Sequence, residues 1–284
     1  MKSDFVFDSA EYQEIINRFK AWEGSIDAQE RRNVAKSLFS CIDNTTLNGS
    51  DSPRSVAEFC RKTVENTVPC ESGPLRVASV CVYPSFVDVA KRILDGSGIG
   101  VASVAGGFPA GQTSQRIKVD EVRYVVGEGA DEVDFVINRD NFLDGNEQAV
   151  FDEVAAAKEA CGERVRLKVI IESGELQTPE NIYNASFLVL QAGADFIKTS
   201  TGKIPVGATP EAAYAMLKAL SKFTNISKKD VGFKAAGGIS NVADAMLYHF
   251  MYKEIVGEEN ITNQKFRIGT SRLTGQLVEF LTLQ

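Results

Sequence analysis

The chain has 284 residues, of which 44% are hydrophobic and 24% charged, so it can bury a large core and is not a disordered chain. Its 31 basic residues stand against 38 acidic ones, and the formal net charge of -7 argues against nucleic acid or an anionic membrane as a partner. The five cysteines are never spaced as CxxC, and His249 is the single histidine. We therefore expect reduced thiols, a cytoplasmic location and no metal site.

The N-terminal segment predicts a helix rather than a secretion signal, because acidic residues interrupt its apolar positions. No stretch of the chain reaches the roughly 18 apolar residues that a membrane span needs. Asp8 followed by Glu11 is typical of a capping box at a helix start. Apolar residues then recur at helical spacing: Tyr12, Ile15, Ile16, Phe19 and Trp22. We expect this helix to pack on the main body of the protein.

From about residue 37 the chain repeats a short apolar run, a turn and a longer segment with helical periodicity. Eight such runs occur, at 37–43, 75–83, 99–106, 131–137, 165–172, 194–201, 231–238 and 266–271. Thr178-Pro179-Glu180 and Thr209-Pro210-Glu211 are typical helix starts between them. Eight strand–helix units predict an α/β fold, a (β/α)8 TIM barrel, with an open doubly wound sheet as the alternative.

The spacing of these units predicts one barrel domain over residues 1–284, because no linker rich in Pro, Gly or Ser divides the chain. Residues 1–35 would form an additional N-terminal helical extension of this barrel. Two roles are open for the extension. It either covers the bottom of the barrel or makes a homodimer contact.

Charged residues interrupt strand runs that should be apolar: Asp43, Asp134, Lys168, Glu172, Lys198 and Lys234. Ionised groups are costly in such surroundings unless they are paired, and catalytic groups of barrel enzymes sit at the carboxyl ends of the strands. Any one of these charges alone is as easily a structural ion pair as a catalytic group. Two lysines and two carboxylates on separate runs favour a catalytic site.

Lys198, in FIKTSTG, predicts an amine nucleophile at the barrel mouth. Lowering a lysine pKa from about 10.4 to near neutrality destabilises the ammonium by roughly 4 kcal/mol. Burial and a second ammonium, that of Lys234 in GFKAAGG, both act in this direction. The pair predicts a Schiff base, whose iminium draws electrons from a breaking carbon–carbon bond. Asp134 would move protons or direct a water, and Asp43 would hold a lysine in place.

Glycines close the seventh and eighth runs, at the two loops that often form a phosphate cradle in barrels. The alternative is that they are turn glycines, needed only for positive φ. Three residues after the sixth run add hydrogen-bond donors and a positive charge. The candidate residues for binding a phosphorylated small-molecule substrate are Thr201, Gly202, Lys203, Gly237, Gly238, Gly269 and Ser271.

Two further reactive residue types receive different predictions. Cys81, at the end of the second run, either faces the site as a thiol or packs as a small buried hydrophobe. His249 lies in a helical segment after the seventh run, and we expect it to pack or lie at the surface without a catalytic role.

Six motifs occur in the order CIDNTTL, VCVYP, ADEVDFVI, KVIIESGEL, FIKTSTGK and GFKAAGG. Together they resemble the deoxyribose-phosphate aldolase family over residues 36–275. The resemblance implies a (β/α)8 barrel and a class I aldolase that uses no metal or other cofactor. Such an enzyme reversibly cleaves 2-deoxy-D-ribose 5-phosphate into acetaldehyde and D-glyceraldehyde 3-phosphate.

The resemblance also implies roles for individual residues of this chain. Lys198 is implied as the Schiff-base lysine, Lys234 as the neighbour that perturbs it, and Asp134 as part of the proton relay. The remaining implied positions are Asp43 and Lys168 in a supporting polar network, Cys81 near the substrate, and Gly202, Lys203, Gly237, Gly238 and Ser271 around the phosphate.

The chain departs from the family pattern at several positions. Ala235 stands where a proline is usual, Arg272 where a second serine is common, and Asn138-Arg139 where Phe-Pro is usual. No tyrosine follows Tyr252 in this sequence, so we expect no tyrosine of the tail to take part in proton transfer. Two other functions stay open: a Schiff-base aldolase or transaldolase with another sugar phosphate, and a sugar-phosphate sensor without turnover.

Overall fold

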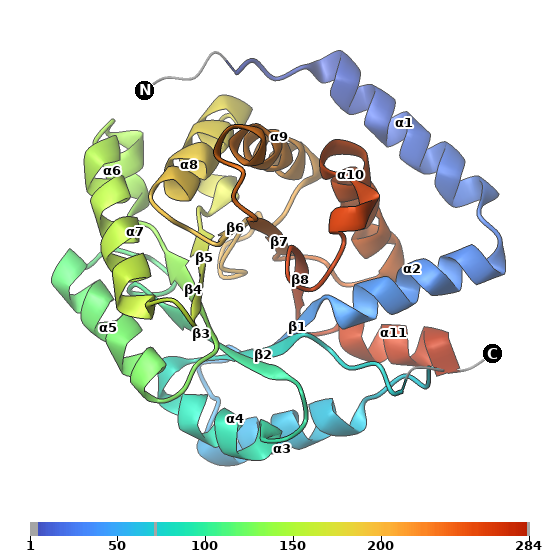
Figure 1. The fold of residues 1–284 in the computed structure, drawn as a ribbon, viewed down its shortest axis with the longest axis horizontal. Helices are drawn as coiled ribbons and strands as arrows, with labels where there is room; N and C mark the ends of the chain where they lie inside the picture. The colour runs from blue at the N-terminus through green and yellow to red at the C-terminus, as the bar shows by residue number, and fades with distance from the viewer. Residues whose placement is uncertain (1–4, 71–72, 283–284) are drawn as a thin grey trace.

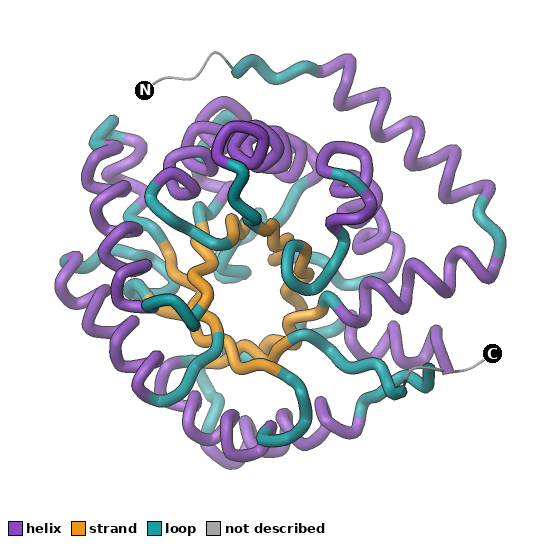
Figure 2. The backbone as a smooth tube through the Cα atoms, in the orientation of Figure 1, coloured by secondary structure: helices purple, strands orange, loops and turns teal. Residues whose placement is uncertain are grey.

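The protein is described here by a computed structural model that covers residues 5–70 and 73–282 (Figure 1). Eight parallel strands pair in sequence order from β1 to β8 and close on themselves. They form the inner ring drawn in Figure 2. Their bounds are β1 Ile42–Thr45, β2 Ser79–Val82, β3 Gly100–Ala105, β4 Glu132–Val136, β5 Arg166–Ile170, β6 Phe196–Lys198, β7 Gly232–Ala236 and β8 Phe266–Thr270.

Helices surround this ring, as expected when each strand is followed by a crossover to the next parallel strand (Figure 1). The longer helices after β1 are α3 Pro53–Glu65, α4 Val87–Leu94, α5 Gln115–Gly127, α7 Glu147–Cys161, α8 Pro179–Gln191, α9 Pro210–Ser227, α10 Val242–Val256 and α11 Leu273–Thr282. Shorter elements are α6 Arg139–Leu143 and the 3-10 turns η1 Pro84–Phe86, η2 Ser173–Glu175 and η3 Glu258–Asn260. The predicted (β/α)8 barrel is confirmed, and the open doubly wound sheet is wrong.

The first predicted strand run was wrong over most of its length. Residues 37–40 complete helix α2 (Ala28–Ser40), and β1 begins only at Ile42. Leu38 and Phe39 are fully buried on this helix. A short apolar run looks the same in a buried helix as in a strand, which explains the error. Each of the other seven runs contains one strand.

The N-terminal extension holds two helices, α1 (Ser9–Ser25) and α2, and its first four residues lie outside the described residues. Asp8 caps α1 by accepting hydrogen bonds from two backbone N–H groups. The Glu11 carboxylate does not complete a capping box: it accepts a 2.6 Å hydrogen bond from Tyr214 and pairs with Lys218 at 3.0 Å, both on α9. Helix α1 therefore lies on the outer wall of the barrel beside α9 and α10 (Figure 1), which disfavours a cover over the barrel's bottom, one of the two roles left open by the sequence.

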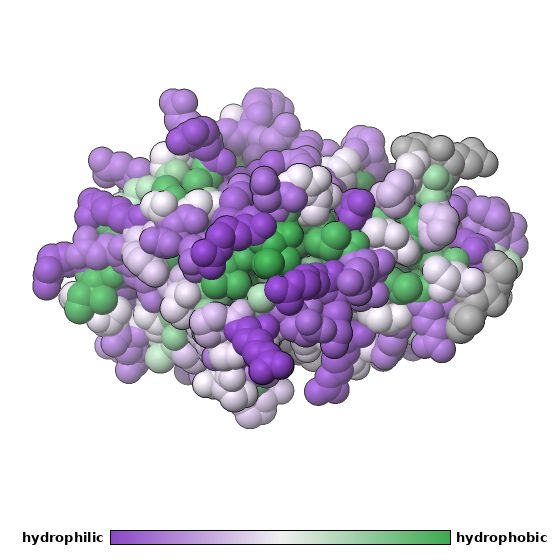
Figure 3. All heavy atoms as spheres, turned by 90° about the horizontal axis from the view of Figure 1, so that it is seen from below, coloured by the Kyte–Doolittle hydropathy of each residue, from purple (hydrophilic) through white to green (hydrophobic). Residues whose placement is uncertain are grey.

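Apolar helix faces packed on the outside of the barrel wall form the main core. Thr178 and Thr209 cap α8 and α9 as predicted, each accepting a hydrogen bond from a backbone N–H in the first turn. The face drawn in Figure 3 is mainly hydrophilic, with apolar residues gathered in a band across its middle. Among the described residues, no helix has the length and apolar content to cross a membrane.

Candidate active site

Strand register brings four of the predicted site residues together inside the barrel. Asp134 on β4 is paired in register with Lys168 on β5, and Lys198 on β6 is paired with Lys234 on β7. Side chains alternate between the two faces of a strand, so residues that share a register level point the same way. All four side chains are buried.

The Asp134 carboxylate is the centre of this group. Its Oδ1 accepts a hydrogen bond from Lys168 Nζ at 3.0 Å. Its Oδ2 accepts hydrogen bonds from both Lys198 Nζ at 2.6 Å and Lys234 Nζ at 2.7 Å. Because the two amines share one oxygen atom, they lie side by side in one polar pocket of the barrel interior.

A second carboxylate, that of Asp43, pairs with two of the lysines. Asp43 Oδ2 lies 2.5 Å from Lys234 Nζ and 3.5 Å from Lys168 Nζ as an ion pair. Its Oδ1 accepts hydrogen bonds from Ser79 Oγ at 2.7 Å and from Arg267 Nη1. Asp43 and Lys168 thus both belong to this buried network of charges, and their role in supporting a reaction stays a prediction.

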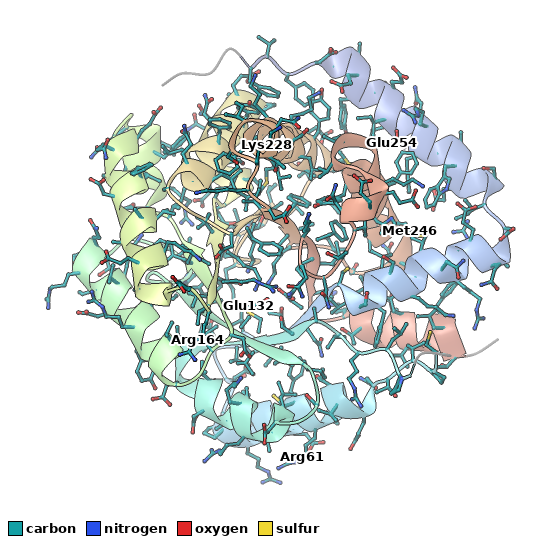
Figure 4. All side chains as sticks on the ribbon, viewed as in Figure 1. Arg61, Glu132, Arg164, Lys228, Met246 and Glu254 are labelled. Atoms are coloured by element: carbon teal, nitrogen blue, oxygen red, sulfur yellow. The ribbon has the colours of Figure 1, made fainter. Side chains whose placement is uncertain are left out.

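Glu132 and Arg267 extend the network, and the sequence analysis missed both. Glu132 Oε2 lies 2.5 Å from Lys168 Nζ, and its Oε1 accepts a 2.7 Å hydrogen bond from Arg267 Nη2. Both side chains are nearly fully buried, and Figure 4 labels Glu132 at the barrel's middle. Glu132 and Arg267 interrupt apolar runs just as the recognised charges do, so the same signal could have found them.

The buried groups carry one more positive than negative charge when all are ionised. The cations are Lys168, Lys198, Lys234 and Arg267, and the anions are Asp43, Glu132 and Asp134. Arg166 lies 3.5 Å from Glu132 but is 36% exposed and solvated. An unpaired buried charge is strongly unfavourable, so loss of one proton from a lysine relieves the cluster.

Lys198 is the lysine best placed to lose that proton. It contacts one carboxylate, whereas Lys234 contacts two and Lys168 three. Burial lowers the pKa of Lys198, and the Lys234 ammonium lowers it further against the opposing pull of Asp134. Burial alone would also lower the pKa of Lys234, but the Asp134 and Asp43 carboxylates outweigh it and raise that pKa. The geometry therefore favours a neutral amine on Lys198 beside a charged one on Lys234.

An open cavity of about 380 Å³ lies above the lysines, between the loops that follow β1, β6, β7 and β8. Lys198 is the one residue of the buried cluster that lines it. All seven candidate phosphate-binding residues line it too: Thr201, Gly202, Lys203, Gly237, Gly238, Gly269 and Ser271. The cavity therefore joins the reactive amine to the glycine-rich loops in one space.

Cys81 lies beneath this cavity rather than in its lining. Its Sγ is 3.9 Å from Asp134 Oδ2, and it packs with the small apolar cluster that includes Leu47 and Val104. Burial raises the pKa of the Cys81 thiol to about 11, and the Asp134 carboxylate adds to the effect. Cys81 is thus a protonated thiol. It contacts Asp134, as a thiol that faces the site would, and it packs among small apolar residues, as a buried hydrophobe would.

The glycines of the cavity serve two different purposes. Gly237 has a φ of 90°, and a Cβ there would come within 2.9 Å of Gly207 Cα, so the turn and the close approach of two loops both require glycine. Gly269 has no positive φ, but a Cβ there would lie 3.0 Å from Lys234 Cε. Gly269 therefore leaves room for the Lys234 side chain.

Several lining residues were missed by the sequence analysis, among them Thr45, Leu47, Asn48 and Ser240. The loop after β1 reaches the cavity because Lys203 Nζ donates a hydrogen bond to the Leu47 carbonyl oxygen. None of these residues is a charge inside an apolar strand run, and none belongs to a glycine-rich loop pattern. The sequence therefore offers no signal for them. The Arg272 side chain is exposed and also lines the cavity.

Glu172 connects the β5 loop to the cavity. Its backbone is left-handed, with φ 53° and ψ 62°, a conformation that non-glycine residues rarely adopt. Its carboxylate accepts hydrogen bonds from Thr201 N at 3.1 Å and Thr201 Oγ1 at 2.5 Å, and lies 3.5 Å from Arg139 Nη1. Arg139, which departs from the family pattern, thus helps to position Thr201 through Glu172. Within the described residues no three His, Cys, Asp or Glu side chains converge as a metal site would require.

The fold and the cavity define a class of protein: an enzyme with a (β/α)8 barrel in which an amine at the carboxyl end of a strand, that of Lys198, faces a cavity formed by the loops that follow the strands. Residues 38–252 match the family described as "DeoC/LacD family aldolase". The chain belongs to this family, and it is an aldolase.

Relatives agree with this assignment over most of the chain. The protein named deoxyribose-phosphate aldolase from Homo sapiens is 41% identical over 245 residues, covering 83% of this chain and 77% of the relative. The protein of the same name from Mus musculus is 42% identical with the same coverage. The solved deoxyribose phosphate aldolase from Aeropyrum pernix, described as a unique tetramer, has a TM-score of 0.71 at 25% identity and covers 98% of this chain and 100% of its own.

Replacing Lys234 with methionine should return the proton to Lys198, because the cluster would then hold equal numbers of cations and anions. We expect the pH midpoint for trapping a small aldehyde with cyanoborohydride to rise by at least about one pH unit. The measurement is the trapping rate against pH, followed by mass spectrometry. Lys222→Met, at an exposed position of α9, is the matched control and should keep the wild-type profile. An unshifted midpoint in Lys234→Met would contradict the proposed charge coupling.

Two arginines that contact Glu132 should differ strongly in their effect on stability. Arg267→Met removes the one guanidinium that pairs with both buried carboxylates, Asp43 and Glu132, and should lower the free energy of unfolding by about 3–5 kcal/mol. Arg166→Met removes a half-exposed partner and should cost less than about 1 kcal/mol. Urea denaturation of the two variants measures both values. Equal losses would show that Arg267 does not stabilise the buried network.

Proposed function

We propose that this aldolase reversibly cleaves 2-deoxy-D-ribose 5-phosphate into acetaldehyde and D-glyceraldehyde 3-phosphate through a Schiff base on Lys198. The observation that carries the proposal is the position of Lys198, which alone in the charged cluster lines the cavity while its amine shares one carboxylate oxygen with Lys234. Relatives that are 41–42% identical carry the name of this activity, which supports the choice of substrate.

The proposed reaction begins at the aldehyde of the open-chain sugar. The neutral Lys198 amine attacks C1, and loss of water gives an iminium. A proton then leaves the C3 hydroxyl, the C2–C3 bond breaks, and its electron pair passes to the iminium to give an enamine. D-Glyceraldehyde 3-phosphate departs with C3 as its aldehyde carbon. Protonation of the enamine at C2 and addition of water to C1 release acetaldehyde and restore the amine.

Asp134 is proposed to take part as a carboxylate that orients the proton carriers. Burial alone would raise the pKa of Asp134, but the ammonium groups of Lys168, Lys198 and Lys234 lower it well below its ordinary value. A carboxylate held so firmly in its charged form is a weak base. It therefore acts by accepting hydrogen bonds from Lys198 and from a water molecule that moves the protons.

The phosphate is proposed to bind between the loops after β7 and β8. Gly237 and Gly238 have positive φ and line the cavity, as does Ser271. Lys203 donates to the Leu47 carbonyl oxygen, so its ammonium already has a partner. Arg272 lines the same cavity, and among the residues described no hydrogen bond or ion pair engages its guanidinium. We therefore assign the main charge contact with the phosphate to Arg272.

The cytoplasmic location and the homodimer contact of the N-terminal extension stay predictions from the sequence. The packing of α1 against α9 and α10 accounts for the apolar stripe of that helix without a partner subunit. We propose a sugar phosphate as the only partner that the site itself requires.

Trapping with acetaldehyde and borohydride tests the identity of the reactive lysine. The imine on Lys198 should be reduced to a stable ethyl-lysine, which peptide mass spectrometry locates. In Lys198→Ala both this adduct and the release of acetaldehyde from 2-deoxy-D-ribose 5-phosphate should fall to background. Lys229→Ala, at an exposed loop position, is the control and should react as the wild type. Undiminished adduct in Lys198→Ala would overturn the assignment.

The role of Arg272 is tested by comparing substrates with and without the phosphate. A charge-assisted hydrogen bond contributes about 1.5–3 kcal/mol, so Arg272→Ser should raise KM for 2-deoxy-D-ribose 5-phosphate by about tenfold or more. The KM for unphosphorylated 2-deoxy-D-ribose should stay the same, and Arg272→Lys should recover part of the loss. If Arg272→Ser affects both substrates equally, or neither, Arg272 does not bind the phosphate.

A further inference from the structure

A second cavity, of about 330 Å³, lies on the outer wall of the barrel between the N-terminal extension and α10. In Figure 1, α1 and α2 form two sides of an angle that opens toward α10. Ion pairing of Arg18 on α1 with Glu254 on α10 at 2.6 Å holds the extension in place. The cavity shares no lining residue with the one above Lys198. No step of the proposed reaction uses it.

One wall of this cavity is aromatic and rigid. The Trp22 and Phe250 rings lie with their centroids 5.2 Å apart and their planes tilted by 34°. Trp22 Nε1 donates a 3.0 Å hydrogen bond to Glu30 Oε1, which fixes the indole ring. Val34 adds an aliphatic surface. Fixed aromatic and aliphatic walls around a few polar groups are typical of small-molecule sites, and planar rings stack well on them.

His249 is the polar group that points to a ligand. It lines the cavity, is only 7% exposed, and makes no hydrogen bond among the residues described. Its ring is held edge-on against Phe266, with centroids 6.1 Å apart. Burial lowers the pKa of His249 to about 4, so the ring is neutral and offers one donor and one acceptor. Neither ring nitrogen of His249 is among the fully buried polar atoms that lack a partner, so both remain accessible and can serve a ligand in the cavity as donor and acceptor.

The charges around the cavity restrict the class of ligand. Glu30, Lys253 and Glu258 contribute to its lining, and Lys253 pairs with Glu258 at 2.9 Å. The lining thus carries one net negative charge, which disfavours a phosphate or carboxylate. This argues against a second molecule of the sugar phosphate as the natural occupant. Asn33 and Ser37 add an amide and a hydroxyl to the same lining.

We propose that this cavity binds an uncharged planar nitrogen heterocycle of about the size of a nucleobase. The ring lies against Trp22 and Phe250, and its hydrogen-bonding edge faces His249. A free base and the base of a nucleoside share this chemistry, and binding experiments with each distinguish them. The inference concerns the outer wall of the barrel and is independent of the reaction proposed for Lys198.

Trp22 is the single tryptophan of the chain, so its fluorescence reports on this cavity directly. The intact protein is titrated with adenine, with deoxyadenosine, and with benzoate as a planar anion. Adenine should change the Trp22 emission saturably, and benzoate should not. A response to adenine but not to deoxyadenosine identifies the free base as the ligand, and a response to both identifies the base moiety as sufficient. No saturable change with adenine, or an equal response to benzoate, overturns the proposal.

Two variants test the site further. His249→Phe keeps a ring against Phe266 but removes the donor and acceptor, and it should weaken adenine binding at least tenfold. Asn33→Phe, at an exposed position of α2, should fill the mouth of the cavity and abolish the response even if His249→Phe does not fold. Both variants should release acetaldehyde from 2-deoxy-D-ribose 5-phosphate at the wild-type rate. Adenine binding of wild-type strength in the folded variants overturns the proposal, whatever the activity of the enzyme is.

Discussion

The structure depends on one carboxylate, that of Asp134, which accepts hydrogen bonds from three lysine amines in the interior of the barrel. The Lys168 and Lys234 ammonium groups could not be buried beside the Lys198 amine without it, because like charges at this spacing repel strongly in a medium of low polarity. With all three lysines charged, Asp43 and Glu132 neutralise the two positive charges that remain, and Arg267 adds a surplus of one. The cluster loses this surplus when a proton leaves the amine with the fewest carboxylate partners, which is Lys198.

The barrel places these groups with little freedom. They come from six strands, with Glu132 and Asp134 both on β4, and the parallel register sets Lys198 beside Lys234 and Asp134 beside Lys168. Strand β6 ends at Lys198, so its amine reaches the cavity while the rest of the network stays beneath. The long loops then contribute separately: Glu172 holds Thr201, and Lys203 joins the loops after β1 and β6. The residues proposed for the reaction therefore lie on the strands of the barrel, and those proposed for substrate binding lie mainly in the loops that follow the strands.

The barrel and the lysine pair could be predicted because both leave local signals. Alternating apolar runs and capped helices mark the units, and a charge inside an apolar run marks the site. The pairing of each lysine with its carboxylates could not be predicted, because the register between two strands cannot be read from the sequence of either strand alone. Arg267 interrupts an apolar run as Lys234 does, so the same signal marks it. Contacts between distant segments, such as Lys203 with Leu47 or Glu11 with Tyr214, leave no local pattern at all.

The central claim is that Lys198 is neutral while Lys168 and Lys234 stay charged. The most direct measurement is the titration of the lysine side-chain nitrogens by NMR on protein labelled with nitrogen-15, with each signal assigned through single Lys→Arg variants. The account predicts that the Lys198 signal titrates well below the ordinary lysine pKa of about 10.4, and that the other two remain protonated throughout that range. A Lys198 signal that titrates at or above the ordinary value would contradict it.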